Sequence, residues 1–305
     1  MIDWFSNNQQ FLLRLAGTIL TAGLLIVLAR NEGWNEIAAA IRQISLMEIV
    51  LAICLVLASR LLVILRWYIL LRSGGVKIRL WDAVALTFTG LFASNFLPTT
   101  IGGDMVRLAG AMQMGFDRAV CLASIAADRL VGMLGMIFAL PFGLVPAWHG
   151  LGPGAAQSLG LAPFLSRLWG FSKRTLQTFS IWVKQPMALV AALGCTFGHM
   201  ICTFGALSAL IDGLGGHVSF WLIGGLWSLA YFVTLVPISI NGYGVQELSL
   251  TFLFSSIGGL SAAASLTVAV LIRGLYLAAS LPGVAYLPNI LAAMSREREV
   301  KALEK

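Results

Sequence analysis

The sequence predicts an all-α, polytopic membrane helix bundle of about seven or eight spans, folded as one integral membrane domain over residues 1–305. Hydrophobic residues make up 59% of the chain and charged residues only 11%, whereas a soluble domain carries about 25% charged residues. Several apolar stretches also approach or exceed the roughly 18 residues that span a bilayer as a helix. This composition excludes soluble enzymes, nucleic-acid readers and secreted disulfide scaffolds.

The elements expected in the first half are apolar runs bounded by polar residues, Gly or Pro. No Lys or Arg precedes Arg14, so we expect the first run to be a membrane helix rather than a cleaved signal peptide. A polar stretch with Glu32 and Glu36 follows it and fits the outer side. The expected elements are Phe11–Ala29, Glu48–Arg72, Leu80–Leu97, a short amphipathic helix to Met114, and Ala119–Val145, which is closed by Pro146.

The second half begins with a segment of a different kind. Residues 155–185 mix Trp and Phe with cations, a pattern that suits a helix lying in the cytoplasmic interface. Apolar spans then resume. They are expected at Pro186–Leu210, Phe220–Val236, a short helix to Ile257, and Ala262–Leu287.

The net charge of +7 is concentrated beside these apolar segments. The positive-inside bias places the basic clusters in the cytoplasm, next to anionic lipid head groups. We therefore expect a multi-pass protein of the bacterial inner membrane with a cytoplasmic C-terminus, and no nucleic-acid partner. The clusters are Arg72, Lys77 and Arg79; Arg167, Lys173, Arg174 and Lys184; and Arg296, Arg298, Lys301 and Lys305.

The span count leaves two topologies open. If Leu80–Met114 returns to the cytoplasmic side, one later span would place the Arg167 cluster outside. Either this pair does not return, or part of Gly150–Trp169 also crosses, which would allow two repeats of inverted topology.

An internal repeat is the most informative feature of the sequence. The same features occur twice in the same order, at about 80–147 and about 218–289. They are an apolar run, a Pro, a glycine pair, an acid, a short helix, an Arg-bearing span and a Pro-containing end. The Arg-bearing spans end near Leu140-Pro141 and Leu281-Pro282. Paired Gly/Pro interruptions in corresponding halves indicate the binding site of a transporter. We expect each repeat to contain a broken, re-entrant pair of half-helices.

The breaks should form an anion site. Unpaired backbone groups persist at membrane depth only against protein or a watery cavity, and the free N–H groups of short helices that begin after Gly103 and Gly244 would attract an anion there. Three arginines could each bind phosphate oxygens in a bidentate manner, and three carboxylates would balance their charge. The predicted site is Asn95, Pro98, Gly102, Gly103, Asp104, Arg107, Asp128, Arg129, Pro237, Asn241, Gly242, Gly244, Glu247 and Arg273.

Other polar residues carry weaker indications. Arg60 falls near the middle of the second helix and needs a partner, but it belongs to no repeat. Cys195, His199 and Cys202 share a helix face, yet a structural zinc site wants four ligands, so we expect no metal. Because the sequence shows no nucleophile elbow, P-loop or metalloprotease His pair, we expect neither an enzyme nor a cofactor.

These motifs resemble a known family. Asn95-Phe96-Leu97-Pro98, Gly103-Asp104 with Arg107, Asp128-Arg129, and Gly242 to Glu247 are similar to motifs in the flippase-like membrane domain of lysylphosphatidylglycerol synthases. The resemblance runs from about Phe11 to Asn289. The family more often has Glu at the positions of Asp104 and Asp128, and Pro-Gly-Gly around Asn241. The soluble aminoacyl-transfer domain has no counterpart here, so that activity is not carried over.

The resemblance implies translocation of an anionic lipid, either a phospholipid or a polyprenyl-phosphate-linked sugar, with the head group and membrane phospholipids as partners. Two alternatives stay open. A secondary transporter of a small soluble anion would need a cavity that is closed to lipid. A scaffold for envelope lipid or glycan assembly would bind envelope glycosyltransferases and tolerate loss of the interior charges.

Overall fold

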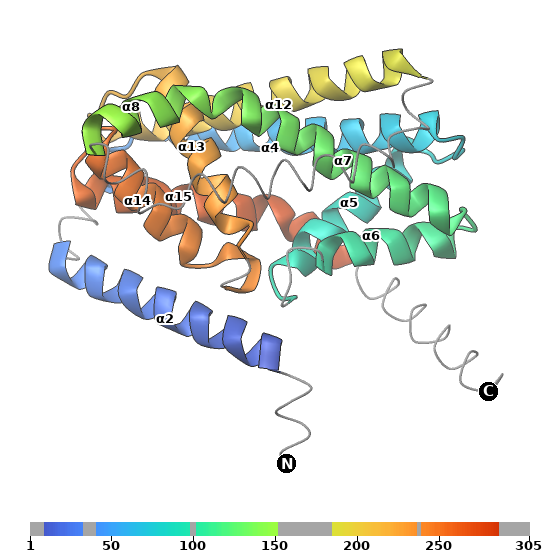
Figure 1. Cartoon of the computed structure of the whole chain (residues 1–305), viewed down its shortest axis with the longest axis horizontal. Helices are drawn as coiled ribbons and strands as arrows, with labels where there is room; N and C mark the ends of the chain where they lie inside the picture. The colour runs from blue at the N-terminus through green and yellow to red at the C-terminus, as the bar shows by residue number, and fades with distance from the viewer. Residues whose placement is uncertain (1–8, 33–40, 98–101, 152–184, 237–238, 287–305) are drawn as a thin grey trace.

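The computed structural model describes residues 9–32, 41–97, 102–151, 185–236 and 239–286. Every regular element within these ranges is helical, which confirms the all-α prediction (Figure 1). The first half contains α2 (Gln9–Glu32), α4 (Leu46–Ser73), α5 (Leu80–Ser94), α6 (Gly102–Gln113), α7 (Arg118–Ala139) and α8 (Pro141–Leu151). The second contains α12 (Pro186–Gly213), α13 (Phe220–Thr234), η2 (Ile240–Gly242), α14 (Val245–Ser256), α15 (Ala262–Ser280) and η3 (Leu281–Ala285).

Helices of matching length recur in the same order in the two halves. α4 and α12 have 28 residues each, α5 and α13 have 15, and α6 and α14 have 12. Short polar side chains fix where several of them begin, because a hydroxyl or carboxylate oxygen accepts an N–H that the first turn cannot satisfy. Ser45, Asp117, Ser219 and Ser261 cap α4, α7, α13 and α15 in this way.

α4 and α12 lie side by side and run in opposite directions (Figure 1). At one end, the Gln185 side chain donates a hydrogen bond to the Ser73 carbonyl at 2.8 Å. At the other end, a Cβ added to Gly213 would lie 2.6 Å from a carboxylate oxygen of Glu48. The corresponding helices α4 and α12 of the two halves are therefore antiparallel, so the halves are inverted with respect to each other.

The helix pair α5–α6 turns back inside the bundle and returns to the end at which it began. A Cβ on Gly103 would lie 2.3 Å from the Gly90 carbonyl oxygen, so the two helices touch through backbone that only glycine permits. At the open end, Phe116 after α6 packs against the hydrophobic cluster that includes Val76 and Ile78 before α5. This is the end of the bundle that also holds Ser73.

The pair α13–α14 returns to the opposite end. A Cβ on Gly216, just before α13, would lie 2.5 Å from the side chain of Leu260, just after α14. The two pairs thus enter from opposite ends, as inversion of the halves requires.

Each half also packs its last element against the other half. Gly143 in α8 approaches Gly225 in α13 closely enough that a Cβ on either residue would clash with the backbone of the other. Gly283 in η3 meets the Phe88 carbonyl of α5 in the same way. These two contacts join the halves into one bundle.

One predicted span is interrupted, and another continues as a different helix type. The expected continuous helix Ala119–Val145 is wrong, because α7 ends at Ala139 and α8 begins at Pro141. Proline lacks the N–H that would continue a helix and is well suited to the first position of a new one. Pro146, which was expected to end the span, lies inside α8. The expected span Ala262–Leu287 runs through α15 and continues as the 3-10 helix η3 from Leu281 to Ala285.

Four helices in the described ranges are long and apolar enough to cross a membrane: α4, α7, α12 and the segment Ala262–Ala285. Shorter apolar helices cover Leu15–Val27, Leu80–Ser94 and Phe220–Thr234. The expected number of spans, seven or eight, stays a prediction. Pro98, Pro237, the basic segment at 155–184 and the C-terminal cluster lie outside the described residues.

Candidate functional site: a cation-lined cavity between two inverted halves

A cavity of about 310 Å³ lies where the two halves meet. Four arginines, one carboxylate and one histidine line it, carried by five different helices. These residues are Arg60 of α4, Asp104 and Arg107 of α6, Arg129 of α7, His199 of α12 and Arg273 of α15. Cations therefore dominate the wall.

Two breaks between helices, one between α5 and α6 and one between α13 and α14, meet at this cavity. They are joined through Asn95, the residue that follows α5. Its side-chain oxygen lies 3.4 Å from the Asn241 side-chain nitrogen and 3.3 Å from the Tyr243 hydroxyl, both in the second break. Its side-chain nitrogen donates to the Ser280 hydroxyl at 3.0 Å. One amide thus ties the tip of the first helix pair to the tip of the second and to the end of α15.

The second break has an unusual backbone that α2 covers. Asn241 has φ 49°, and Gly244 has φ 78°, conformations that are costly for most side chains but open to Asn and Gly. Thr18 of α2 accepts the Ile240 N–H at 2.8 Å, and the Thr21 hydroxyl lies 3.1 Å from the Tyr243 carbonyl. A Cβ on Gly244 would lie 2.2 Å from that hydroxyl, so the α2 contact requires glycine there.

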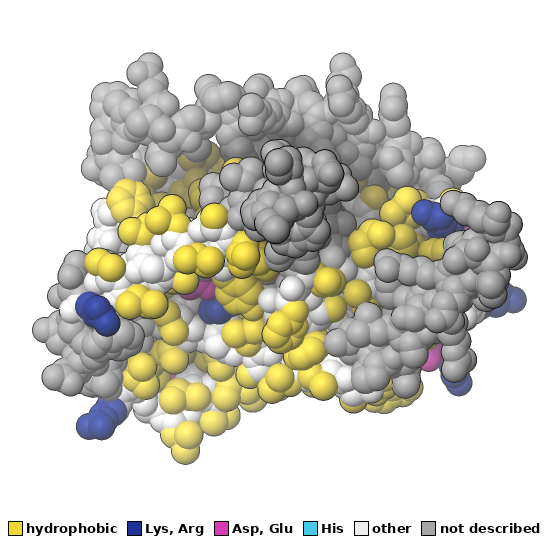
Figure 2. Space-filling view, turned by 90° about the horizontal axis from the view of Figure 1, so that it is seen from below, with side chains coloured by type: hydrophobic (Ala, Val, Ile, Leu, Met, Phe, Trp, Pro, Cys, Tyr) yellow, Lys and Arg dark blue, Asp and Glu magenta, His cyan; other side chains and the backbone are white. Residues whose placement is uncertain are grey.

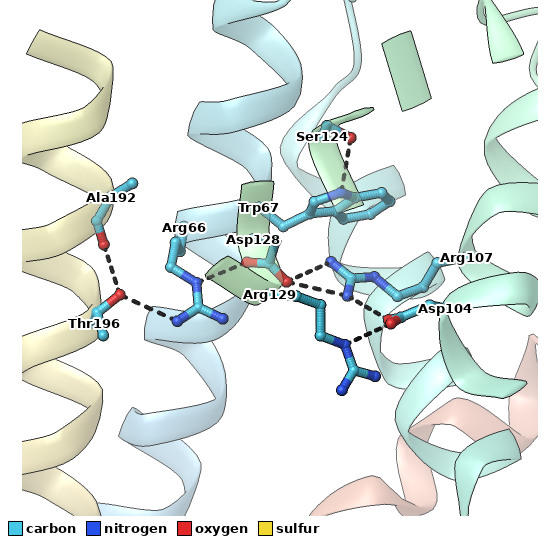
Figure 3. A network of polar contacts seen from close by, with 9 residues as sticks. All are labelled: Arg66, Trp67, Asp104, Arg107, Ser124, Asp128, Arg129, Ala192 and Thr196. Carbon is cyan, nitrogen blue, oxygen red and sulfur yellow. Dashed lines mark hydrogen bonds and ion pairs between the residues drawn. The ribbon is translucent and has the colours of Figure 1, made fainter. Parts of the chain in front are cut away.

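A chain of alternating charges fills the interior of the first half (Figure 3). Asp128 accepts from Arg66 at 2.7 Å and from Arg107 at 3.3 Å. Arg107 also reaches Asp104 at 3.2 Å, and Asp104 accepts from Arg129 at 2.6 Å. The order Arg66–Asp128–Arg107–Asp104–Arg129 begins and ends with a cation, so the chain carries one excess positive charge.

One ion pair is repeated in both halves. Asp104 and Glu247 are each the third residue of a 12-residue helix that follows a break. Each carboxylate pairs with an arginine from the next long helix, Asp104 with Arg129 and Glu247 with Arg273. The Arg129 side chain is 36% exposed and Arg273 14%. Both arginines line the cavity.

Aromatic rings lie against three of the four cavity arginines. The Arg107 guanidinium carbon lies 4.1 Å from the centre of the Trp67 ring, and that of Arg60 lies 3.9 Å from the centre of the Tyr276 ring. Arg273 lies 4.9 Å from the Tyr243 ring. Such contacts stabilise a cation by about 0.5–2 kcal/mol without neutralising it.

The structure brings most of the predicted site residues together but gives them different positions. Asn95, Gly103, Asp104, Arg107, Arg129, Asn241 and Arg273 line the cavity. Asp128 and Glu247 are buried behind it as partners of the arginines. Gly102, Gly242 and Gly244 shape the backbone at the breaks. Pro98 and Pro237 lie outside the described residues.

One expectation about charge is wrong, and another stays a prediction. α14 begins directly after Gly244, as expected, and α6 begins at Gly102; the Gly244 N–H donates to the Glu247 carboxylate at 2.7 Å, so this one amide is not free for an anion. The expected balance of three cations against three anions is wrong, because Arg66 and Arg60 add two more cations to the interior.

Sequence reasoning missed Arg66. Its Nε binds Asp128 and its Nη1 donates to the Thr196 hydroxyl of α12 at 3.1 Å, so it links three helices. The available signal was its position inside a 28-residue apolar helix, because an ionisable residue at membrane depth indicates a functional or paired group. His199 was correctly placed on a helix face, where its Nδ1 lies 2.7 Å from the Ser59 hydroxyl.

The outer surface suits a lipid environment. Leu61, Val190 and Ile201 on α4 and α12 are 57%, 63% and 59% exposed, although large apolar side chains of soluble proteins are mostly buried. Figure 2 shows one face in which a small patch of acidic and basic side chains is visible left of centre among hydrophobic ones. Together with the four long apolar helices, this surface identifies a multi-pass membrane protein.

Comparison with known proteins agrees with this architecture. The family model described as "Lysylphosphatidylglycerol synthase TM region" matches residues 14–283, which include both breaks and every described cavity residue. A comparison with curated proteins found no match.

Proposed function

Because the chain belongs to the family of the lysylphosphatidylglycerol synthase TM region, we propose that it translocates an anionic lipid across the bacterial inner membrane. The observation that carries the proposal is the cavity in which four arginines face a single carboxylate at the meeting point of two inverted halves. Inverted repeats that hold a central site between broken helices are typical of secondary transporters.

The cavity provides what a phosphate head group needs at membrane depth. Guanidinium groups bind phosphate oxygens through paired N–H donors, and Arg129 and Arg273 come from opposite halves of the bundle. A head group between them would replace part of their contacts with Asp104 and Glu247. Each arginine would then exchange a carboxylate for the phosphate of the head group, so each guanidinium stays paired with an anion while the head group passes.

The two helix pairs would act as re-entrant elements with their tips near the middle of the bilayer. With 15 and 12 residues, the helices of the first pair are each shorter than the roughly 20 residues of a full span. The acyl or prenyl tails would stay in the bilayer beside the bundle.

The antiparallel α4 and α12 favour one orientation. Arg72, Lys77 and Arg79 lie at the end that also holds Gln185, which directly follows the basic segment at 155–184. Lys184 directly precedes Gln185 in the sequence, and the positive-inside bias makes an end with these cations cytoplasmic. We place the Glu48 and Gly213 end on the outer side.

The test is lipid movement in vesicles that contain the purified protein. A panel of fluorescent anionic phospholipids is reconstituted, and loss of fluorescence after addition of an impermeant quencher reports transfer between leaflets. Arg129→Gln and Arg273→Gln should slow transfer by about 10- to 150-fold, the equivalent of one hydrogen bond to a charged group.

Arg72→Gln is the matched control, because this exposed arginine lies on α4 outside the cavity and its loss should leave the rate unchanged. Wild-type rates in both cavity variants would reject the proposal. They would favour instead the scaffold hypothesis, under which the interior charges are dispensable and glycosyltransferases are the partners.

A soluble small anion is the second candidate substrate. A volume of about 310 Å³ holds a phosphate head group and a free anion equally well, so size does not separate them. Uptake of radiolabelled phosphate into the same vesicles, with no lipid transfer by the wild type, would favour this candidate.

A further inference from the structure

Arg60 differs from the other arginines of the cavity in its contacts. Arg107, Arg129 and Arg273 each bind a carboxylate. Arg60 has no counterion among the described residues: its guanidinium lies over the Tyr276 ring, and its buried Nε has no hydrogen-bond acceptor. The ring attracts the cation but carries no net charge. The described part of the chain therefore leaves the charge of Arg60 without an anionic partner.

Two more polar atoms in the cavity wall have no hydrogen-bond partner among the described residues. They are Oγ1 of Thr87 on α5 and Nε of Arg107 on α6, and the two residues are only 1% and 6% exposed. A buried polar atom without a partner is costly, because it has lost its hydrogen bonds to water. Like the Nε of Arg60, both atoms can donate a hydrogen bond. An acceptor supplied by a ligand would therefore satisfy all three.

The three unsatisfied atoms belong to neighbouring helices. Trp67 follows Arg60 by seven residues on α4, which places both residues on the same face, and the Arg107 guanidinium carbon lies 4.1 Å from the centre of the Trp67 ring. A Cβ on Gly90 of α5 would lie 2.7 Å from the Arg107 side chain. Thr87 precedes Gly90 by three residues, about one helical turn. α4, α5 and α6 thus bring these donors to a common wall of the cavity.

We propose that Arg60, with Thr87 and the Nε of Arg107, forms a resting subsite in which the phosphate group of the substrate binds before it reaches Arg129 and Arg273. The inference rests on the proposed function and specifies where its substrate binds first. Binding at Arg60 breaks no ion pair, whereas binding at Arg129 or Arg273 competes with a carboxylate. Arg60 therefore sets the affinity for the substrate, and the other two arginines act during its passage.

The alternative role of Arg60 is to hold the Tyr276 ring in place. The two roles predict opposite effects of Arg60→Met, which replaces the charged side chain by an unbranched apolar one. Loss of a packing contact lowers the melting temperature, whereas loss of a buried charge without a partner leaves it unchanged or raises it. We expect delipidated Arg60→Met in phosphate-free detergent to melt at or above the wild-type temperature. Melting well below the wild type, or failure to fold, assigns Arg60 to packing and overturns the proposal.

Binding of phosphatidylglycerol to the delipidated protein in the same detergent tests the subsite directly. Arg60→Met should weaken binding by about 10- to 150-fold, the equivalent of one hydrogen bond to a charged group. Arg60→Lys, which keeps the charge, should retain most of the affinity. Thr87→Val should weaken binding by about 2- to 13-fold, the equivalent of one ordinary hydrogen bond. Arg72→Met is the control on α4 and should bind as the wild type does. Wild-type affinity in Arg60→Met overturns the proposal.

Transfer in phosphatidylcholine vesicles with increasing fractions of phosphatidylglycerol separates the resting subsite from the path of passage. Arg60→Met should need a larger fraction for half-maximal transfer, and its maximal rate should not fall, because the lost contact belongs to the bound resting state. A lower maximal rate at an unchanged half-maximal fraction would overturn the resting subsite.

Two further outcomes distinguish this inference from the proposed function. Binding that depends on Arg60, without transfer of any lipid, would support the subsite and reject translocation. Inorganic phosphate that binds as tightly as phosphatidylglycerol would support the subsite and overturn the lipid as its occupant.

Discussion

Asp128→Asn removes the carboxylate that holds two buried arginines. Asp128 is 3% exposed and lies between Arg66 and Arg107. Loss of one partner of a buried ion pair costs about 3–5 kcal/mol, because the remaining charge stays in a medium of low polarity. A free-energy change of 1 kcal/mol corresponds to about 2–4 °C in chains of roughly 150–250 residues. We therefore expect a fall of about 6–20 °C in the apparent melting temperature.

The double variant Arg66→Met/Asp128→Leu provides the decisive comparison. It removes one cation and one anion together and leaves Arg107–Asp104–Arg129 with its single excess charge. Replacement of a whole buried pair by apolar side chains is often neutral or stabilising. The double variant should therefore melt at a higher temperature than Asp128→Asn, although it changes more atoms.

Melting in detergent can be followed by tryptophan fluorescence at one scan rate, because membrane-protein unfolding is often irreversible. Arg72→Met on the exposed end of α4 supplies the surface control. The charge argument is refuted if the double variant is at least as unstable as the sum of Asp128→Asn and Arg66→Met. It is equally refuted if Asp128→Asn lowers the melting temperature no more than the control.

Three further outcomes are expected. Gly103→Ala should prevent stable folding, because its Cβ would lie 2.3 Å from a carbonyl oxygen of α5. Gly274→Ala adds a Cβ that has no atom within 4 Å, so it should raise stability by up to about 1 kcal/mol. Melting curves of the two variants test this. Asn95→Leu should slow lipid transfer in vesicles, because it removes the amide that joins the tips of the two helix pairs; a wild-type rate would contradict that role. Single cysteines at Gln185 and Asp212, at opposite ends of α12, in a variant without the four native cysteines, should react with an impermeant maleimide from opposite sides of the membrane; labelling of both from one side would refute a membrane-spanning α12.

The sequence was most informative where a residue type imposes a local backbone. Proline and glycine clusters located both breaks, and the short helices after them occur close to the expected positions. An acid after each break and an arginine in each following span were also recognisable, since such charges need partners at membrane depth. Their actual pairing within each half, Asp104 with Arg129 and Glu247 with Arg273, followed the order of the repeat.

The remaining features depend on tertiary contacts. Nothing in α4 or α12 taken alone shows that they are antiparallel neighbours, because both are long and mainly apolar helices. The charge of Arg66 was visible inside such a helix, but its partner lies on α7, 62 residues away in sequence, and no local pattern indicates that pairing. Hydropathy continues through Pro141 and Pro146 and so does not show the break at Leu140, although the repeat placed the end of the Arg-bearing span there.

The contacts that α2 makes with the second break, between α13 and α14, make the two inverted halves unequal. Movement of the α13–α14 tip away from α2 would break the contacts of Thr18 with Ile240 and of Thr21 with Tyr243. The Thr21 hydroxyl has a second acceptor in the Gly17 carbonyl of its own helix at 2.8 Å, so the cost rests mainly on the Thr18 hydrogen bond, at about 0.5–1.5 kcal/mol. A two-state equilibrium governed by that tip would be biased roughly 2- to 13-fold toward the state in contact with α2. A difference in stability between the two halves would thus follow from one threonine hydroxyl.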